Sequence, residues 1–178
     1  GYVLLRTSNK NQIGDNQGHD ELMHAVLLRE IPISSTVIVS SEDLYLESPQ
    51  LAEQAYINFI DTPLARDRDE TEETSGLMLK TVAPIFDEQH RFIGTVYGAN
   101  LINRNFEIVD KVKHTVYENV IYKGQDVGTA TIFQDDLRVS TNVKNEDGAR
   151  AIGTRVSEEV YNQVVEQDES RLRWRKRS

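Results

Sequence analysis

Two apolar segments with a short polar connection between them constrain the fold of this chain most strongly. The segments span residues 77–86 and 92–102, and five polar residues, 87–91, separate them. Parallel strands need a crossover of about a dozen residues or more, whereas a connection of this length joins antiparallel neighbours. The sequence therefore predicts a β-hairpin and an antiparallel sheet.

The residues before this hairpin carry signals for two helices and a further strand. Asp20 precedes apolar side chains at helical spacing and predicts a helix over residues 21–29. Residues 35–40 form a short, β-branched run, which predicts a strand. Ser48 supplies a cap and Pro49 suits the first helical position, so a second helix is expected to start there.

A similar set of signals follows the hairpin. Asn105 is expected to cap a helix that runs to about residue 120, and Ser157 a helix over residues 158–167. Strands are predicted at residues 129–133, 137–143 and 150–154. Strands and helices thus come twice in a similar order. The predicted fold class is α+β, with antiparallel sheets and helices on one face.

Residues 61–76 are predicted to form a long polar loop with a charge run at positions 66–73. A loop of this length inside a compact domain is often a binding lid or a flexible connector. The simpler interpretation is a run of solvated charges, and both interpretations stay open at this point.

Charge and cysteine content narrow the functional classes. The formal net charge is −9, and the last eight residues carry five positive charges and no acid, which leaves −14 for residues 1–170. Such a surface repels phosphate backbones and argues against nucleic-acid binding by the folded part. The chain has no cysteine, which excludes disulfides, thiolate catalysis and thiolate metal sites. No run approaches 18 apolar residues, so no segment of this sequence is expected to span a bilayer. The sequence starts at Gly1, which suggests a piece of a longer protein.

His19 and His24 are the candidates for metal or acid–base chemistry. A zinc peptidase needs two histidines one helical turn apart with a glutamate beside the first. Here the spacing is five, which sets the two side chains about 140° apart on a helix. We expect no metal site and no cofactor. The sequence contains no nucleophile elbow, phosphate loop or dinucleotide fingerprint. A hydrolase that uses Asp15, His19 and His24 stays open as a less favoured alternative.

Several segments resemble a known family. They are residues 128–134 (GTATIFQ), 138–143 (RVSTNV) and 147–157 (DGARAIGTRVS), together with residues 95–105 (TVYGANLINRN) upstream. The sequence of these segments resembles the Cache family of bacterial sensor domains, and most closely the extracytoplasmic double-Cache type found ahead of histidine kinases, chemoreceptors and cyclases. The likeness covers roughly residues 1–166.

The resemblance implies a PAS-like antiparallel sheet flanked by helices and built twice, in a double-Cache arrangement with truncated ends. The expected parts are a membrane-distal module over residues 1–122, a partial membrane-proximal module over 123–167 and a basic tail over 168–178. The family's long N-terminal helix is missing before Gly1, and its closing strands are missing after Val165. The basic tail suits either an anionic membrane face or a disordered end.

In such a module the ligand lies between the sheet and the loops and helix over it, and strand alternation indicates which residues face it. Period-2 spacing groups Met78, Lys80 and Val82 on one strand, and Thr95, Tyr97 and Ala99 on its neighbour. A lysine in such a run needs an anionic partner, which a carboxylate ligand would supply, or else it lies on a solvent face. The candidate ligand contacts here are Arg29, Tyr45, Lys80 and Tyr97.

In the second module the candidate contacts are Arg138 and Thr141, which stand among the polar residues of the quoted segments. An arginine is suited to a bidentate grip on a carboxylate. The alternative is that these polar residues fix the hairpin and turn geometry. Gly148 and Gly153 are expected to meet a need for positive φ or for a close approach of backbone.

These observations favour an extracytoplasmic small-molecule-sensing domain of a transmembrane receptor, a histidine kinase or chemoreceptor, that binds its ligand without chemistry. The expected ligand is an organic acid or amino acid; the parent protein is expected to be anchored in the inner membrane, and a second copy of the chain is a candidate partner. A cytosolic PAS- or GAF-like dimerisation module is the alternative.

Overall fold

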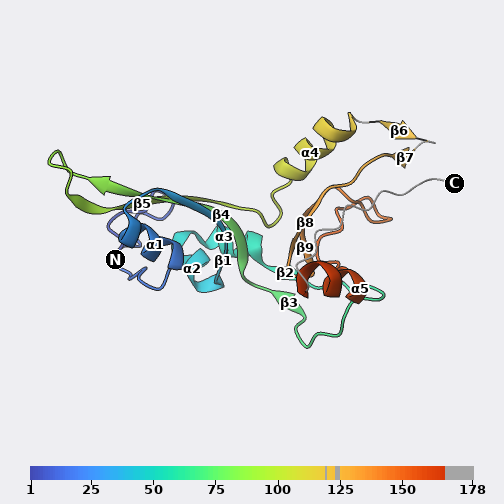
Figure 1. The fold of residues 1–178 in the computed structure, drawn as a ribbon. Coiled ribbons are helices and arrows are strands. Elements are labelled where there is room, and N and C mark those ends of the chain that lie inside the picture. The colour runs from blue at the N-terminus through green and yellow to red at the C-terminus, as the bar shows by residue number, and fades with distance from the viewer. Residues whose placement is uncertain (119, 123–124, 167–178) are drawn as a thin grey trace. The chain divides into compact units, whose positions relative to one another are not determined.

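The computed structural model describes residues 1–118, 120–122 and 125–166 (Figure 1). The chain divides into two compact units. Unit 1 comprises residues 1–56 and 74–105, and unit 2 comprises residues 57–73 and 106–178. The predicted modules are continuous stretches, so they do not coincide with these discontinuous units, and the predicted module bounds stay a prediction. The predicted basic tail lies outside the described residues.

The sheet of unit 1 has three antiparallel strands in the order β1-β4-β5, where β1 is Ile33–Val39, β4 is Gly76–Phe86 and β5 is Phe92–Leu101. The predicted hairpin is β4 and β5, and it is confirmed. In its register Lys80 pairs with Ala99 on one side and with Ser35 of β1 on the other. These three side chains therefore lie in one row on the same face of the sheet.

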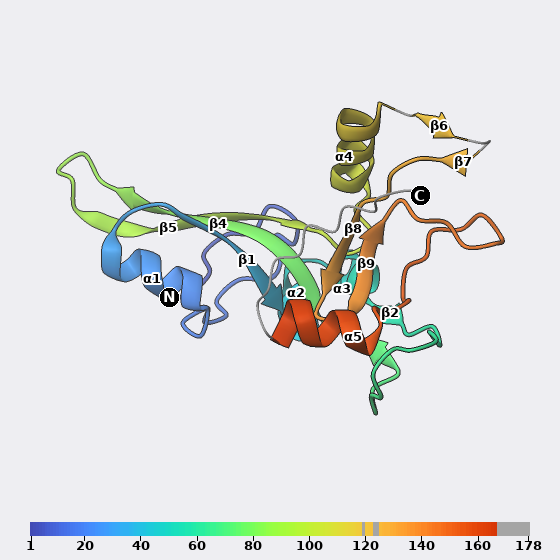
Figure 2. The same cartoon turned by 45° about the vertical axis from the view of Figure 1, so that its right-hand side comes forward.

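Three helices, α1 (Glu21–Arg29), α2 (Ser41–Glu47) and α3 (Pro49–Ala55), cover one face of this sheet (Figures 1 and 2). The predicted bounds of α1 are confirmed, and the Asp20 carboxylate accepts a hydrogen bond from the Met23 amide at 2.8 Å. The predicted start of α3 is also confirmed. Helix α2 was not predicted; Ser40 caps it by accepting from the Asp43 amide at 3.1 Å.

Two apolar clusters fix these helices to the sheet. One joins the buried face of α1 to β4, and the other joins α2 and α3 to the ends of β4 and β5. The first contains Leu22, Met23, Val26 and Val82, and the second contains Leu44, Ala55, Met78 and Leu101. Burial of these side chains drives the packing. The opposite face of the sheet leaves Ile38, Leu79 and Val96 exposed.

The described residues of unit 2 form three antiparallel strand pairs and two α-helices. The strand pairs are β2 (Ile57–Asn58) with β3 (Glu72–Glu73), β6 (Ile121–Tyr122) with β7 (Gln125–Asp126), and β8 (Thr131–Gln134) with β9 (Leu137–Thr141). The helices are α4 (Glu107–Tyr117) and α5 (Glu158–Tyr161), and a π-helical turn, Asn162–Glu166, follows α5. The predicted β8–β9 hairpin is confirmed, as is the Ser157 cap of α5.

Two local predictions in the second half are wrong. Residues 150–154 form no strand, because Gly153 has φ +89° and the Ile152 amide bonds back to the Arg150 carbonyl in a tight turn. Asn105 does not cap α4, because its side chain donates to Asn100 at 3.1 Å and Phe106 stands at the cap position.

One backbone arrangement occurs in both units. In unit 1 the Val3 amide donates to the Asp15 carbonyl, the Gly14 amide donates to the Val3 carbonyl, and Tyr2 bridges Asn16. In unit 2 the corresponding hydrogen bonds join Arg138 to Thr154 and to Gly153, and Leu137 bridges Arg155. Both glycines have positive φ, +86° and +89°. A side-chain-capped helix follows each arrangement, α1 in one unit and α5 in the other.

The architecture therefore combines antiparallel sheets with flanking helices. This confirms the predicted α+β class and is consistent with a Cache or PAS-like fold. The repeated backbone arrangement is a local similarity between the two units, and the predicted doubling of a whole module stays a prediction.

Candidate functional site

A cavity of about 930 Å³ lies in unit 1. Its volume falls within the range of about 300–1,000 Å³ that is usual for small-molecule sites. The inner face of the sheet, the start of α1, helix α2 and the N-terminal segment all contribute to its wall. The polar lining includes Ser8, Gln17, Asp20, Ser35, Asp43, Glu47, Lys80 and Tyr97, and the apolar lining includes Leu22, Ala25, Val37, Met78 and Ala99.

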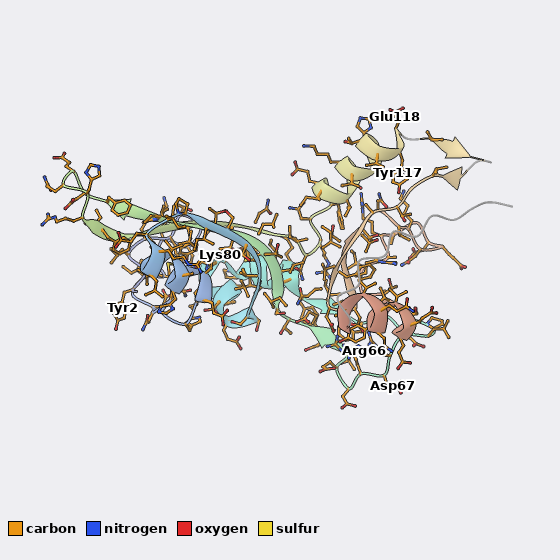
Figure 3. All side chains as sticks on the ribbon, in the orientation of Figure 1. Tyr2, Arg66, Asp67, Lys80, Tyr117 and Glu118 are labelled. Atoms are coloured by element: carbon orange, nitrogen blue, oxygen red, sulfur yellow. The ribbon has the colours of Figure 1, made fainter. Side chains whose placement is uncertain are left out.

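Lys80 is buried at the sheet side of this cavity, and Figure 3 shows it between the sheet and the helices. Its ammonium group donates to the Asp20 carboxylate and lies 4.7 Å from the centroid of the Tyr97 ring. The solvent-face interpretation of Lys80 is therefore wrong. Burial disfavours the charged form of Asp20, but hydrogen bonds from Lys80 and from the Met23 amide outweigh it and lower the pKa of this carboxyl.

Tyr97 and Glu47 connect the sheet to the N-terminal segment. The Tyr97 hydroxyl donates to Glu47 Oε1 at 2.5 Å, and Arg6 Nε donates to the same oxygen at 2.8 Å. Burial, followed by this hydrogen bond, raises the pKa of Tyr97 above its usual range. Arg6 is buried and also binds Asp15 with two nitrogens, which holds the pKa of Asp15 well below its usual range. A chain of charged hydrogen bonds thus runs along one side of the cavity.

The charges around the cavity are mainly negative. Four acidic residues line it, against one lysine and one histidine: Asp20, Glu21, Asp43 and Glu47 against Lys80 and His19. The Lys80 charge is matched by Asp20, so no ligand carboxylate is needed to satisfy it. Arg6, which supports the wall from behind, is shared between Asp15 and Glu47. The charge of the cavity wall that is left uncompensated is therefore acidic.

The structure brings two of the four predicted contacts of the first module to this cavity. Lys80 and Tyr97 line it together. Arg29 is exposed at the last turn of α1, and Tyr45 is 61 % exposed on α2; neither lines the cavity. Arg29 lies in the last turn of α1, where a positive charge interacts favourably with the helix dipole.

Of the two predicted contacts in unit 2, Thr141 has a structural role. It is fully buried, and its hydroxyl pairs with that of Thr131 at 2.6 Å across the β8–β9 hairpin and accepts from the Val143 amide at 3.0 Å. Arg138 lies above the Phe133 ring, and its buried Nε has no hydrogen-bond partner among the described residues. Burial lowers the pKa of Arg138. Its role as a carboxylate contact stays a prediction.

The loop before β3 makes specific contacts in unit 2. The carboxylate of Asp136 is fully buried and accepts from Arg155 at 2.6 Å, from Arg68 at 3.0 Å and from Arg66 at 3.1 Å. The Arg66 guanidinium also lies over the Tyr161 ring of α5, and Figure 3 shows Arg66 beside this helix. For these two loop arginines the solvated-charge interpretation is wrong, because they tie the loop to the β8–β9 turn.

The residues of the hydrolase alternative do not form a catalytic arrangement. Asp15 is occupied by Arg6, His19 approaches Asp43 at 3.3 Å, and His24 is exposed on α1. Within the described part of the chain none of these three side chains hydrogen-bonds to another, as a nucleophile–base pair requires. The same part contains no group of three or more metal-ligating side chains and no helix long and apolar enough to cross a bilayer.

Sequence reasoning identified Lys80 and Tyr97 but missed two residues of the wall, Asp20 as an ion-pair partner and Glu47, and also missed Arg6, which binds Glu47 from behind the wall. Arg6 stands in the apolar run at residues 2–7, so the argument applied to Lys80 would also have indicated a buried cation there. The sequence indicated Asp20 as a helix cap, but nothing in it indicated that the second carboxylate oxygen pairs with Lys80.

Residues 100–176 match the model of a family described as Single cache domain 3. The matched stretch is less than half of the chain and lies mostly in unit 2. It supports a Cache sensor domain, a class that binds small molecules and is typically extracellular, and it describes one such domain and not two. The comparisons with curated proteins and with solved structures gave no match.

Proposed function

We propose that this chain is the extracytoplasmic sensing part of a transmembrane signalling receptor, and that it binds a small solute in the cavity of unit 1 without chemistry. The observation that carries this proposal is the cavity itself, which combines a ligand-sized volume with a buried Lys80 paired to Asp20 and with Tyr97 in its wall. The Cache match in the other half of the chain supports the same class. A receptor of the histidine kinase or chemoreceptor type would read the bound state as a shift in population.

The ligand class follows from the charges of the wall. We propose a small solute that carries an ammonium group, such as an amino acid, in preference to a dicarboxylate. Asp43 and Glu47 can accept from such a group, and the Ser8 and Ser35 hydroxyls can bind its polar substituents. A dicarboxylate that approaches Lys80 would be repelled by the Asp20 carboxylate, which already pairs with this lysine, and by the other acids of the wall.

A double arrangement of Cache-like modules is part of this proposal. Its support is the repeated backbone arrangement, in which a positive-φ glycine, a bridge and a capped helix recur in the same order. In unit 1 this arrangement carries side chains of the cavity wall, including Gln17. In unit 2 it carries Arg155, which binds the buried Asp136.

The proposal predicts that an ammonium-bearing solute raises the melting temperature of the chain. At a hundredfold excess over Kd, binding adds about 2.7 kcal/mol to the stability of the folded state. For a chain of this size that corresponds to about 5 °C or more. The measurement is a thermal-shift panel of amino acids, small amines, dicarboxylates and sugars.

A matched pair of variants assigns the shift to the cavity. Ala99 faces the cavity beside Lys80, so Ala99→Leu should abolish the ligand-induced shift by filling the space. Ala83 lies on the opposite face of the sheet, and Ala83→Leu should leave the shift unchanged. A shift that survives in Ala99→Leu, or a broad panel without any shift, would contradict the proposed site.

A further inference from the structure

We infer that residues 1–17 form a strap beside the cavity of unit 1 and that the Glu47 carboxylate holds this strap closed. The inference concerns the regulation of the cavity and therefore rests on the proposed function. It assigns a positioning role to Glu47, whose oxygen contacts both the strap and the sheet.

The strap is a loop whose two ends are tied together. Val3 and Gln17 donate backbone hydrogen bonds to Asp15 and Gly1, and Tyr2 bridges Asn16. Compact surface loops with adjacent ends are frequently functional. Three strap residues, Thr7, Ser8 and Gln17, line the cavity, so the position of the strap sets the shape of the wall.

Apart from the buried side chain of Val3, polar contacts hold the strap in place. None of the described residues 1–17 belongs to either apolar cluster of unit 1. Its large apolar side chains are mostly exposed, namely Tyr2, Leu4, Leu5 and Ile13. Segments with few buried apolar contacts open at low free energy compared with core strands. The strap is therefore the part of the cavity wall that opens most easily.

Glu47 is the residue through which the strap contacts the sheet side of the cavity. Glu47 Oε1 accepts from Arg6 of the strap and from Tyr97 of β5. The Ser8 hydroxyl also donates to the Glu47 carbonyl at 2.9 Å, and the Asn9 amide donates to the Leu46 carbonyl at 3.0 Å. A solute that contacts Tyr97 changes one of the two hydrogen bonds at Glu47 Oε1 and thereby the hold on Arg6.

The test compares hydrogen exchange in two glutamate variants of the same helix. Glu47→Gln removes the negative charge that pairs with Arg6 and weakens the remaining hydrogen bond, and we expect exchange in residues 1–17 to become about tenfold faster, which corresponds to about 1.4 kcal/mol. Glu42 is exposed in the first turn of α2, and the hydrogen bonds from the strap to this helix go to Leu46 and Glu47 instead, so Glu42→Gln should stay within about twofold of the wild type. Peptides covering β4 report whether the whole unit is affected.

A second variant tests the connection to the cavity. Tyr97→Phe removes one hydrogen bond to Glu47 and keeps Arg6 in place, and we expect strap exchange to change by about twofold to fivefold. Unchanged strap exchange in Glu47→Gln, or equal acceleration in the strap and in β4, would overturn the role of Glu47. Unchanged strap exchange in Tyr97→Phe would overturn the coupling to the cavity. This test uses no ligand, so its result does not depend on whether the ligand panel gives a hit. Failure of the proposed function and failure of the role of Glu47 can therefore be told apart.

Discussion

Asp136→Asn is expected to lower the free energy of unfolding of unit 2 by about 3–5 kcal/mol. The Asp136 carboxylate is fully buried and accepts hydrogen bonds from three arginines. An asparagine would keep the shape of the side chain but would leave three partly buried guanidinium groups without their common anion. Removing one partner from a buried ionic cluster costs far more than removing a surface pair.

The neighbouring residue provides the control for this prediction. Asp135 also contacts Arg66 and Arg68, but its side chain is 36 % exposed. Asp135→Asn should therefore cost about 1 kcal/mol or less. The measurement is urea unfolding followed by circular dichroism, with hydrogen exchange of β8 and β9 to assign the transition to unit 2. Equal losses for the two variants would show that the buried cluster does not stabilise the fold.

The same carboxylate gives a pH dependence with a definite sign. Burial disfavours its charged form, but hydrogen bonds from Arg155, Arg68 and Arg66 outweigh burial and lower the pKa of Asp136. Its contribution is therefore present above the pKa of an unfolded aspartate, about 3.9, and is lost as the pH falls below it. The stability difference between the wild type and Asp136→Asn should shrink below about pH 4.

Gly153→Ala is the second substitution with a large expected effect, a loss of about 2–4 kcal/mol in unit 2. Gly153 has φ +89°, and a Cβ there would stand 2.5 Å from the carbonyl oxygen of Asn58. The backbone cannot move away easily, because the Gly153 amide bonds to the Arg138 carbonyl and its own carbonyl accepts from the Ile60 amide. Strain and a clash with backbone therefore add together.

Gly148→Ala separates these two contributions. Gly148 has φ +85°, but nothing lies within 4 Å of its Cβ position. It should cost only the conformational strain of about 1–2 kcal/mol. Unfolding of both variants in urea tests the difference. If Gly148→Ala destabilises as much as Gly153→Ala, the close approach to Asn58 is not the cause.

The sequence predicted those parts of the fold whose signals are local. The β4–β5 hairpin follows from two apolar runs and a short connection, and α1 follows from Asp20 and helical spacing. Helix α2 was missed because it has only seven residues. Its local signal is a short one, Ser40 with Asp43 three positions later. The discontinuous units could not be predicted, because contacts between distant segments have no local signature.

The candidate site was predictable to the extent that a buried charge stands out in an apolar strand. Lys80 was identified in this way, but its partner Asp20 is 60 positions away in the chain. A carboxylate ligand was expected because the sequence showed no anionic partner for Lys80. Once Asp20 supplies that charge, the remaining acids of the wall favour the opposite sign. The ligand class that we propose therefore depends on pairing between residues far apart in the chain, which hydrophobic periodicity does not report.

A calorimetric titration tests the central claim most directly. An amino acid or amine that raises the melting temperature is titrated into the wild type and into Ala99→Leu. We expect saturable binding of one molecule per chain to the wild type and none to Ala99→Leu, with dicarboxylates inert. Equal binding to both proteins, or binding of dicarboxylates alone, would contradict a solute site between the sheet, α1 and α2 of unit 1.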